Sequence, residues 1–416
     1  MRSLADWLEQ QQQSHPSAID LTLERVREVA RRLDLLTPAY RVITVGGTNG
    51  KGSTVCYLDS LLRAAGQTTG RFTSPHLIRY NERICVNGKE ATDAELIESF
   101  EHIDAARREI TLTFFEYNSL AALERFRRAR VDTAVLEVGL GGRLDATNIL
   151  DADVAVVCSV GLDHVDWLGG TLDEIGREKA GIFRSARPAV LGSPDLPASV
   201  RQVIEETGAF PVERGRDFRA LRHNNGWDFE CNALRLRNLP LPALAGPQQV
   251  DNAATALAAL AVGDFGIELT HDVVSRALRA ARLPGRFQIV PGEVEWILDV
   301  AHNVPAARVL ADNLAALPAK RTIAVVGILG DKDIGGILAT LSPRVDAWVP
   351  VKLEGPRTVS AQSLAAHLPP AAPVVELAAN VVAGCRAARA AAAPGDRIVV
   401  FGSFLTVGPA LDFLGI

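Results

Sequence analysis

A glycine-rich stretch near residue 50 combines residue types that bind phosphate. It reads Gly46-Gly47-Thr48-Asn49-Gly50-Lys51-Gly52-Ser53-Thr54, between an apolar run and a helical pattern. Glycines let backbone N–H groups surround phosphate oxygens, and the helix N-terminus adds partial positive charge. Lys51 could reach the β- and γ-phosphates, and Ser53 or Thr54 could meet magnesium. The stretch predicts a nucleotide site, although Gly52 departs from the strict G-x-x-x-x-G-K-[ST] pattern and a plain connecting turn is the alternative.

Two further polar groups follow apolar runs. Glu137 interrupts residues 134–138, and His164 follows residues 153–160. Ligands bind outside the carboxyl ends of parallel strands, so we expect both groups beside the phosphate loop. A carboxylate, a neutral imidazole and a hydroxyl next to a triphosphate suit an octahedral Mg²⁺. The alternatives are a buried ion pair with an arginine for Glu137 and a hydrogen-bonded structural role for His164.

The elements that must position these groups alternate between strands and helices. Strands are predicted at residues 41–45, 132–138, 153–160, 296–299, 322–327 and 397–402. Runs that are apolar on both faces and separated by helices indicate an α/β fold with a covered parallel sheet. One helix is predicted from Ser53 to Gly66, and another begins at Thr171, where Glu174 completes a capping box. Residues 208–245 indicate irregular β structure, and residues 387–393 indicate a helix.

The length of 416 residues predicts two domains. Proline and glycine punctuate the chain at Leu283-Pro284-Gly285-Arg286, and a new strand pattern follows. We therefore expect a P-loop-type parallel-sheet ATPase domain over residues 1–284. A smaller Rossmann-like α/β domain is expected over residues 285–416.

Composition and charge argue against several classes of protein. The net charge of −5 gives no general attraction for nucleic acid or an anionic membrane, so neither partner is expected. Five scattered cysteines without a C-x-x-C pair indicate neither a disulfide framework nor a thiolate zinc site. No run of 18 apolar residues and no apolar leader are present, which predicts a cytoplasmic protein. A monomer is expected because no large apolar stripe lies outside the predicted cores.

Six segments, in this order, resemble the folylpolyglutamate synthase/dihydrofolate synthase family of the Mur-ligase-like superfamily. They are residues 47–53, 73–77, 137–148, 162–164 together with 168–169, 176–182 and 299–303. The resemblance spans nearly the whole chain. It implies a bifunctional ligase of folate biosynthesis that uses ATP to join L-glutamate to dihydropteroate and to reduced folates through an acyl phosphate. The alternatives are a monofunctional folylpolyglutamate synthase and, further away, another Mur-type amide ligase.

The resemblance also implies roles for single residues around ATP and metal. Ser74, Glu137 and His164 would bind one or two magnesium ions, and Lys179 would carry a carbamate made with carbon dioxide. Read without the family, Lys179 is an ordinary solvated lysine. The residues that would bind the nucleotide are Gly47, Thr48, Asn49, Gly50, Lys51, Gly52, Ser53, Thr54, Asn252, Arg286 and Asp299. The catalytic groups would be Lys51, Glu137, His164, Lys179 and His302, with His302 near the incoming glutamate.

The pterin side of the substrate would be bound by three further segments. They are Ile19, Asp20, Leu21 and Thr22; Thr113, Phe114, Phe115 and Glu116; and Leu144, Asp145 and Ala146. Phe115 would stack on the heterocycle and Asp145 would accept its N–H groups, with a core aromatic as the alternative for Phe115. Interdomain hydrogen bonds or caps are the alternatives for Asn252, Arg286, Asp299 and His302. Val304 departs from the family, which usually has proline after His302-Asn303.

Overall fold

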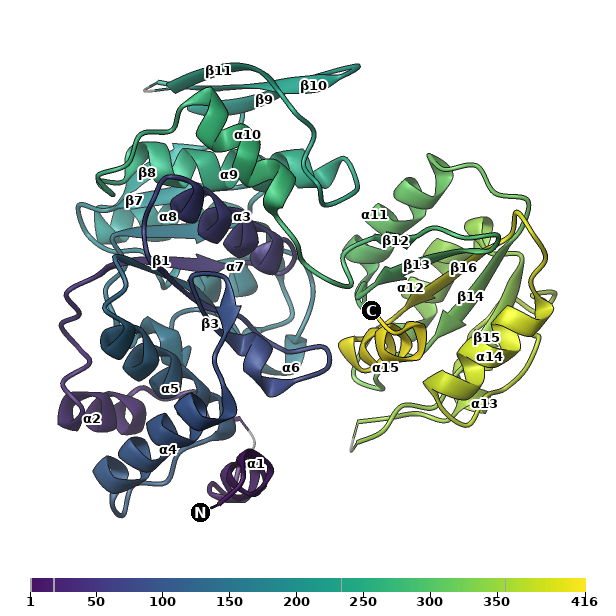
Figure 1. The fold of residues 1–416 in the computed structure, drawn as a ribbon, viewed down its shortest axis with the longest axis horizontal. Coiled ribbons are helices and arrows are strands. Elements are labelled where there is room, and N and C mark those ends of the chain that lie inside the picture. The colour runs from purple at the N-terminus through teal and green to yellow at the C-terminus, as the bar shows by residue number, and fades with distance from the viewer. Residues whose placement is uncertain (1, 18, 233, 356) are drawn as a thin grey trace. The chain divides into compact units, whose positions relative to one another are not determined.

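A computed structural model describes residues 2–17, 19–232, 234–355 and 357–416, and its chain forms two compact units (Figure 1). The first unit comprises Met1–His76, Tyr80–Ala243 and Val250–Ala281, and the second comprises Leu77–Arg79, Leu244–Gln249 and Arg282–Ile416. The chain thus passes from one unit to the other near residue 282. Two short segments from earlier in the sequence also belong to the second unit.

The first unit is built on an eight-stranded sheet of order β4-β3-β2-β5-β1-β6-β7-β8. Its strands are β1 (Arg41–Gly46), β2 (Thr69–Phe72), β3 (Ile84–Val86), β4 (Lys89–Glu90), β5 (Thr133–Glu137), β6 (Val154–Val157), β7 (Pro188–Leu191) and β8 (Phe210–Glu213). The six strands from β2 to β8 in this order are parallel, while β3 and β4 extend one edge antiparallel. Every residue of β5 and β6 is buried, which explains their apolar runs.

Helices cover this sheet through separate apolar clusters. Side chains of α1, α2, α4 and α5 pack with Val42 of β1, Phe72 of β2 and Leu136 of β5. A second cluster joins β6 and β7 to α7 and α8. The helices of the unit are α1 (Leu4–Gln13), α2 (Glu24–Arg32), α3 (Lys51–Ala64), α4 (Asp93–Arg107), α5 (Phe114–Ala129), α6 (Val165–Leu168), α7 (Leu172–Ala180), α8 (Ala198–Thr207), α9 (Gln248–Val262) and α10 (His271–Ala280).

Two of these helices test the expected start signals. Thr171 caps α7 and forms the capping box with Glu174, as predicted. The helix predicted from Ser53 begins two residues earlier, at Lys51, because Gly50 adopts a left-handed conformation and is itself the N-cap. The helix therefore starts inside the phosphate loop (residues 46–54).

Residues 208–245 are more regular than expected. After β8 they form a three-stranded antiparallel sheet of β9 (Phe218–His223), β10 (Gly226–Cys231) and β11 (Leu234–Leu239). In β10 the large apolar side chains alternate, with Trp227 and Phe229 buried. This period of two explains a regular hairpin in a segment that is also rich in charge.

The second unit contains a five-stranded sheet of order β12-β13-β16-β14-β15, parallel except for β12. Alternate residues of its strands supply two clusters, one with α11 and α12 and the other with α14 and α15, as in a Rossmann-like α/β fold. The bounds are β12 (Gln288–Val290), β13 (Glu295–Asp299), α11 (Val304–Ala315), β14 (Thr322–Val326), α12 (Ile334–Leu341), β15 (Ala347–Pro350), α13 (Ala361–Ala365), α14 (Val381–Ala391), β16 (Arg397–Phe401) and α15 (Phe404–Leu414). The helix expected over residues 387–393 ends at Ala391, shortly before Pro394 and Gly395.

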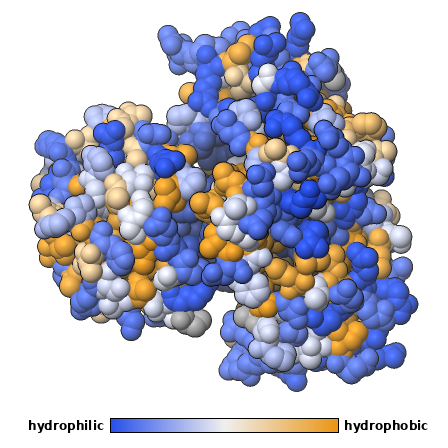
Figure 2. All heavy atoms as spheres, turned by 180° about the vertical axis from the view of Figure 1, so that it is seen from behind, coloured by the Kyte–Doolittle hydropathy of each residue, from blue (hydrophilic) through white to orange (hydrophobic). Residues whose placement is uncertain are grey.

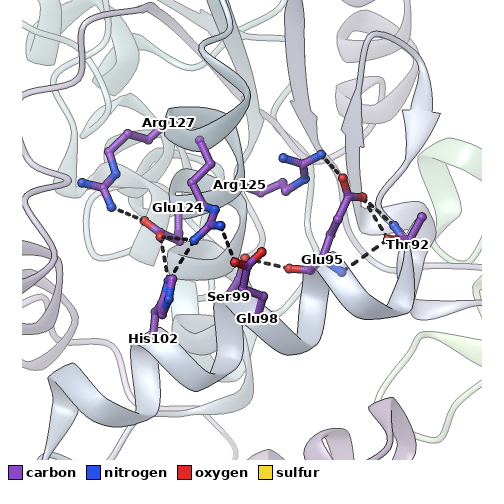
Figure 3. A network of polar contacts seen from close by, with 9 residues as sticks. Thr92, Glu95, Glu98, Ser99, His102, Glu124, Arg125 and Arg127 are labelled. Carbon is purple, nitrogen blue, oxygen red and sulfur yellow. Dashed lines mark hydrogen bonds and ion pairs between the residues drawn. The ribbon is translucent and has the colours of Figure 1, made fainter.

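A buried carboxylate ties α4 to α5 (Figure 3). Glu124 Oε2 accepts from Arg127 Nη2 at 2.7 Å, and Glu124 Oε1 lies 3.1 Å from His102 Nδ1 and 3.9 Å from Arg128 Nη1. Nearby, Glu95 pairs with Arg125. Glu124 is therefore a structural charge whose partners all come from its own helix and its neighbour.

The surface is mostly hydrophilic on the face shown in Figure 2, with apolar side chains interspersed. None of the described helices has both the length and the apolar character that crossing a membrane requires. All five cysteines are buried and free.

Candidate active site

The phosphate loop depends on two glycines with positive φ. Gly47 has φ of 141° and Gly50 has φ of 88°, conformations that favour glycine. A Cβ on Gly47 would lie 3.1 Å from Cys158 Cβ, and one on Gly50 would lie 2.9 Å from Asn252 Oδ1. Asn252, in the second turn of α9, therefore lies directly against the loop.

The segment after β6 holds the loop in place. Thr48 N–H donates to Ser159 O at 2.8 Å. Ser159 Oγ accepts from Asn49 N–H at 3.0 Å and donates to Asn49 O at 2.9 Å. Thr48 Oγ1 accepts from Gly161 N–H at 3.0 Å. These bonds fix the loop between the carboxyl ends of two adjacent strands.

Lys51 lies over the loop that precedes it. Its Nζ donates to Gly47 O at 2.9 Å and to Thr48 O at 3.2 Å. Because the N-cap is a glycine, no side chain of that residue caps the first turn of α3. A cation and helix-terminal N–H groups are thus held together, which is the arrangement that binds phosphate.

Glu137 and Ser74 meet at the ends of neighbouring strands. Glu137 is the last residue of β5, is paired in register with Val45 of β1, and is only 4% exposed. Ser74 follows β2, and its N–H donates to Glu137 Oε2 at 3.3 Å. The carboxyl edge of the sheet therefore carries a buried carboxylate, a serine and the phosphate loop, as the sequence predicted.

His164 lies on the loop after β6 with φ of 53°. Its N–H donates to Asp163 Oδ1 at 2.9 Å, and its Nε2 lies 3.9 Å from that same oxygen. The described residues include no cluster of three His, Cys, Asp or Glu that could hold a metal by itself. The predicted set of Ser74, Glu137 and His164 contains two residues of these types, so phosphate oxygens and water would have to complete the coordination.

Lys179 is buried at the end of α7, so the interpretation as a solvated lysine is wrong. Burial, and to a smaller extent the charge of Lys51, lowers the pKa of Lys179 to about 7. Asp163 and Asp145 act in the opposite direction. The amine therefore exchanges its proton near neutral pH, inside the same group of charges as Lys51.

Two of the three segments predicted for the pterin side are joined by an arginine. Arg25 donates to Asp20 Oδ2 at 2.8 Å and to Glu116 Oε1 at 3.2 Å. Thr113 and Glu116 form the capping box of α5. Ile19, Leu21 and Thr22 are half-buried beside Asp20, and Thr22 Oγ1 has no hydrogen-bond partner among the described residues.

The third predicted segment, residues 144–146, is linked to the second through Gly139. Asp145 accepts from Gly139 N–H, and Gly139 packs against the Phe115 ring. A Cβ on Gly139 would lie 2.4 Å from Phe115 Cζ, and the Phe115 ring lies 5.8 Å from that of Phe72. Asp145 accepts from Gly139 N–H and Leu140 N–H, both at 2.9 Å, and from Thr147. Burial raises the pKa of Asp145 against these bonds. Both oxygens of Asp145 thus already have internal donors, and Leu144 and Ala146 flank it on the same loop.

The second unit gathers its predicted residues around Phe404. Arg286 lies 5.1 Å over the Phe404 ring, and the His302 ring lies 6.4 Å from it. Asp299 ends β13 and accepts from Phe287 N–H and Ala301 N–H, both at 2.8 Å. His302 Nδ1 lies 2.8 Å from Val300 O.

The departure at residue 304 leaves the following helix intact. Asn303 caps α11 by accepting from Ala306 N–H at 3.0 Å, and Pro305 lies in the first turn. Val304 is the first helical residue, so proline is not needed there to start the helix.

Sequence reasoning missed Ser159 and Cys158. Both lie at the carboxyl end of the predicted strand 153–160, where ligand sites of parallel sheets occur. Their position was therefore a usable signal. Their residue types were not, because serine and buried cysteine are common in any core or loop.

A phosphate loop, an acid at the neighbouring strand end and a second α/β unit are the parts of a Mur-type ligase. The Mur ligase middle domain matches residues 45–260, and the Mur ligase, glutamate ligase domain matches residues 285–404. The dihydrofolate synthase/folylpolyglutamate synthase of Escherichia coli is 47% identical and covers 99% of this chain and 95% of its own length. The chain belongs to the dihydrofolate synthase/folylpolyglutamate synthase family, as its motifs predicted.

Solved structures agree with this assignment. E. coli FolC in complex with DHPP and ADP has a TM-score of 0.95 at 47% identity, covering 100% of this chain and 98% of that one. A bifunctional folylpolyglutamate synthase/dihydrofolate synthase with Mn, AMPPNP and L-glutamate bound has a TM-score of 0.92 at 46% identity, covering 100% and 99%.

Proposed function

We propose that this chain is an ATP-dependent ligase that joins L-glutamate to dihydropteroate and to reduced folates. The observation that carries the proposal is the meeting of the phosphate loop, Ser74 and Glu137 at one sheet edge, in a chain 47% identical to a bifunctional relative. Relatives of the same fold bind ADP with DHPP, and AMPPNP with Mn and L-glutamate. A monofunctional folylpolyglutamate synthase remains the alternative.

ATP and a divalent cation, Mg²⁺ in the cell, fit the residues at this edge. Residues 47–54 and Asn252 would hold the phosphates of ATP. Ser74, Glu137 and His164 would hold the cation, since a buried carboxylate at a strand end is costly without a compensating charge. The cation would supply charge neutralisation at the phosphate oxygens.

A carbamate on Lys179 would extend this metal site. Its neutral amine would attack carbon dioxide, forming a C–N bond and releasing one proton, which replaces a cation by an anion. The pKa of about 7 supports this step because much of the amine is neutral at physiological pH. The conversion would also remove the repulsion between Lys179 and Lys51, and the product could hold a second cation.

The substrates would occupy the segments described above. The pterin would bind among residues 19–22, 113–116 and 144–146, with Phe115 as its stacking surface. Arg286 and Asp299 of the second unit would contact the nucleotide, and His302 the incoming glutamate. Residues 1–284 would thus form the ATP, metal and folate domain, and residues 285–416 the glutamate ligase domain.

The chemistry follows from these positions. An oxygen of the substrate carboxylate attacks the γ-phosphorus, ADP leaves, and Lys51 stabilises the charge on the transferred phosphoryl oxygens. The amino group of L-glutamate then attacks the acyl carbon, loses a proton, and inorganic phosphate leaves. An acyl phosphate hydrolyses readily, so the site must exclude water while it exists. We propose that the enzyme is a cytoplasmic monomer.

Two buried glutamates provide a matched test of this function. Glu137→Gln should lower ligase turnover at saturating ATP by at least about 100-fold, because it removes a metal-binding charge. Glu124→Gln changes an equally buried acid that only ties α4 to α5. Turnover should be unchanged, and the free energy of unfolding should fall by about 1–3 kcal/mol. Both variants are assayed by ADP release and by urea unfolding.

Substrate dependence completes the test. ADP release by the wild-type enzyme should require both dihydropteroate and L-glutamate. Near-normal turnover of Glu137→Gln, or ATP hydrolysis without either substrate, would contradict the proposed function.

A further inference from the structure

Arg83 is a buried arginine that forms no ion pair with an acidic side chain of the described residues. It ends the short 3₁₀ helix Tyr80–Arg83, ahead of β3, and is 8% exposed. In the described part of the chain it forms one side-chain hydrogen bond, from Nε to His76 Nδ1 at 2.8 Å, and no ion pair. A buried guanidinium is costly unless an anion accompanies it.

Two other largely buried arginines of the chain have internal partners for their terminal NH₂ groups. In the first unit, Arg71 donates from Nη2 to Cys85 at 3.0 Å, and its Nη1 lies 3.8 Å from Asp59. In the second unit, Arg397 donates to Leu314 O and to Thr322 Oγ1. Arg83 differs because both terminal NH₂ groups lack a partner among the described residues, while Nε is already fixed.

The surroundings of Arg83 leave these two groups available. Its guanidinium carbon lies 5.8 Å from the Tyr80 ring centroid and 5.5 Å from that of Phe114. Aromatic rings interact with the cation through their faces and take no hydrogen bond from the in-plane donors of the fork. The guanidinium is therefore fixed by the hydrogen bond of its Nε, and its two terminal NH₂ groups can bind a carboxylate with two parallel hydrogen bonds.

Arg83 also lies between two parts of the site. Its carbonyl accepts from Thr73 N–H at 2.9 Å, next to Ser74, and its guanidinium interacts electrostatically with Glu137. On the other side, Phe114 belongs to the segment proposed to bind the pterin. A substrate that reaches from the pterin segment to the metal residues must place its reacting carboxylate between them.

We propose that Arg83 binds the carboxylate of the pterin substrate that becomes phosphorylated. The proposal rests on the proposed function, because that function defines which carboxylate reacts. Arg83 would orient one oxygen toward the γ-phosphate and stabilise the charge that the carboxylate carries before transfer. No residue of the predicted pterin set supplies a cation for this purpose.

The test compares dihydropteroate with its analogue that lacks the carboxylate, both measured by calorimetry. The wild-type enzyme should bind dihydropteroate roughly 10- to 100-fold more tightly than the analogue, as expected for charge-assisted hydrogen bonds. Arg83→Gln should abolish that ratio and raise KM for dihydropteroate, with the affinity for ADP unchanged. Arg83→Lys keeps the cation between the rings and should retain part of the ratio.

Arg71→Gln is the matched control, because it removes a buried arginine that has internal partners. The Arg71→Gln variant should be less stable than the wild type, and it should keep the full ratio of affinities for dihydropteroate and its analogue. A ratio that survives in Arg83→Gln, or a loss of ADP affinity in that variant, would overturn the assignment while leaving the ligase function intact. A wild-type enzyme that does not bind dihydropteroate would overturn both.

Discussion

Buried charges in the first unit fall into two groups according to their partners. Glu124 is paired with arginines of α5 and contacts His102 of α4. Glu137 accepts a 3.3 Å bond from Ser74 N–H and ends a strand beside the phosphate loop. The same residue type thus serves packing in one place and is suited to metal binding in the other.

Lys179 allows a prediction about pH. Folded, its pKa is about 7, whereas in the unfolded chain it is about 10.4. Between these values the unfolded chain binds a proton that the folded chain does not, so stability rises with pH. Lys179→Met should therefore be more stable than the wild type at pH 6–7, by on the order of a few kcal/mol, with a margin that shrinks toward pH 10.

The measurement is urea unfolding across this pH range in buffer free of carbon dioxide. Adding bicarbonate should stabilise the wild type and leave Lys179→Met unchanged, and ¹³C-labelled bicarbonate should give a carbamate signal in the wild type alone. A margin that does not depend on pH would show that the lysine is not buried as described.

At the scale of elements, the turn after β6 acts as a support for the turn after β1. Ser159→Ala removes both bonds between Ser159 Oγ and the backbone of Asn49. We expect the affinity for Mg-ADP to fall about 5- to 20-fold, measured by calorimetry, because the loop loses about 1–2 kcal/mol of support. Ser342→Ala removes a hydroxyl that bonds Leu338 O in the second unit and should leave the affinity unchanged. Equal affinities in both variants would show that the loop needs no such support.

Elements with a strong local signal were predicted well from the sequence. The six predicted strands appear in the structure with ends shifted by a few residues, because strands buried on both faces are apolar throughout. The capping box at Thr171 was readable for the same local reason. The antiparallel strands β3 and β4 were not predicted, since three and two residues carry no period.

The parts of the site that were missed depend on packing between distant segments. Lys179 is buried, and the backbone of its turn packs against the loop at residues 139–143, since a Cβ on Gly142 would lie 2.8 Å from Lys179 O. Arg83 is buried by aromatic rings from its own turn and from α5. The spacing of residues within either segment does not indicate such contacts. The sequence therefore predicted a solvated Lys179 and no role for Arg83.

At the scale of the whole molecule, a short segment that follows Ser74, which we propose binds the cation, belongs to the second unit. Leu77–Arg79 belongs to that unit although the residues on either side belong to the first. Leu77 packs against the cluster of α14 and α15, and a Cβ on Gly285 would lie 3.5 Å from Leu77 Cδ1. Ser74 lies only three residues before Leu77 in the sequence, so we expect a displacement of this segment to disturb Ser74.

Gly408→Ala tests that dependence. A Cβ on Gly408, within α15, would lie 2.1 Å from Leu77 O, and a backbone oxygen cannot move away without displacing the segment. We expect turnover to fall at least about 10-fold at saturating ATP, since displacing Ser74, which we propose binds the cation, would be costly to catalysis. Gly335→Ala, in α12, is the matched control: its nearest neighbour would be His367 at 3.8 Å, so the helix should gain up to about 1 kcal/mol and activity should stay. Circular dichroism would verify that both variants fold, and full turnover in Gly408→Ala would mean that Ser74 is positioned by the first unit alone.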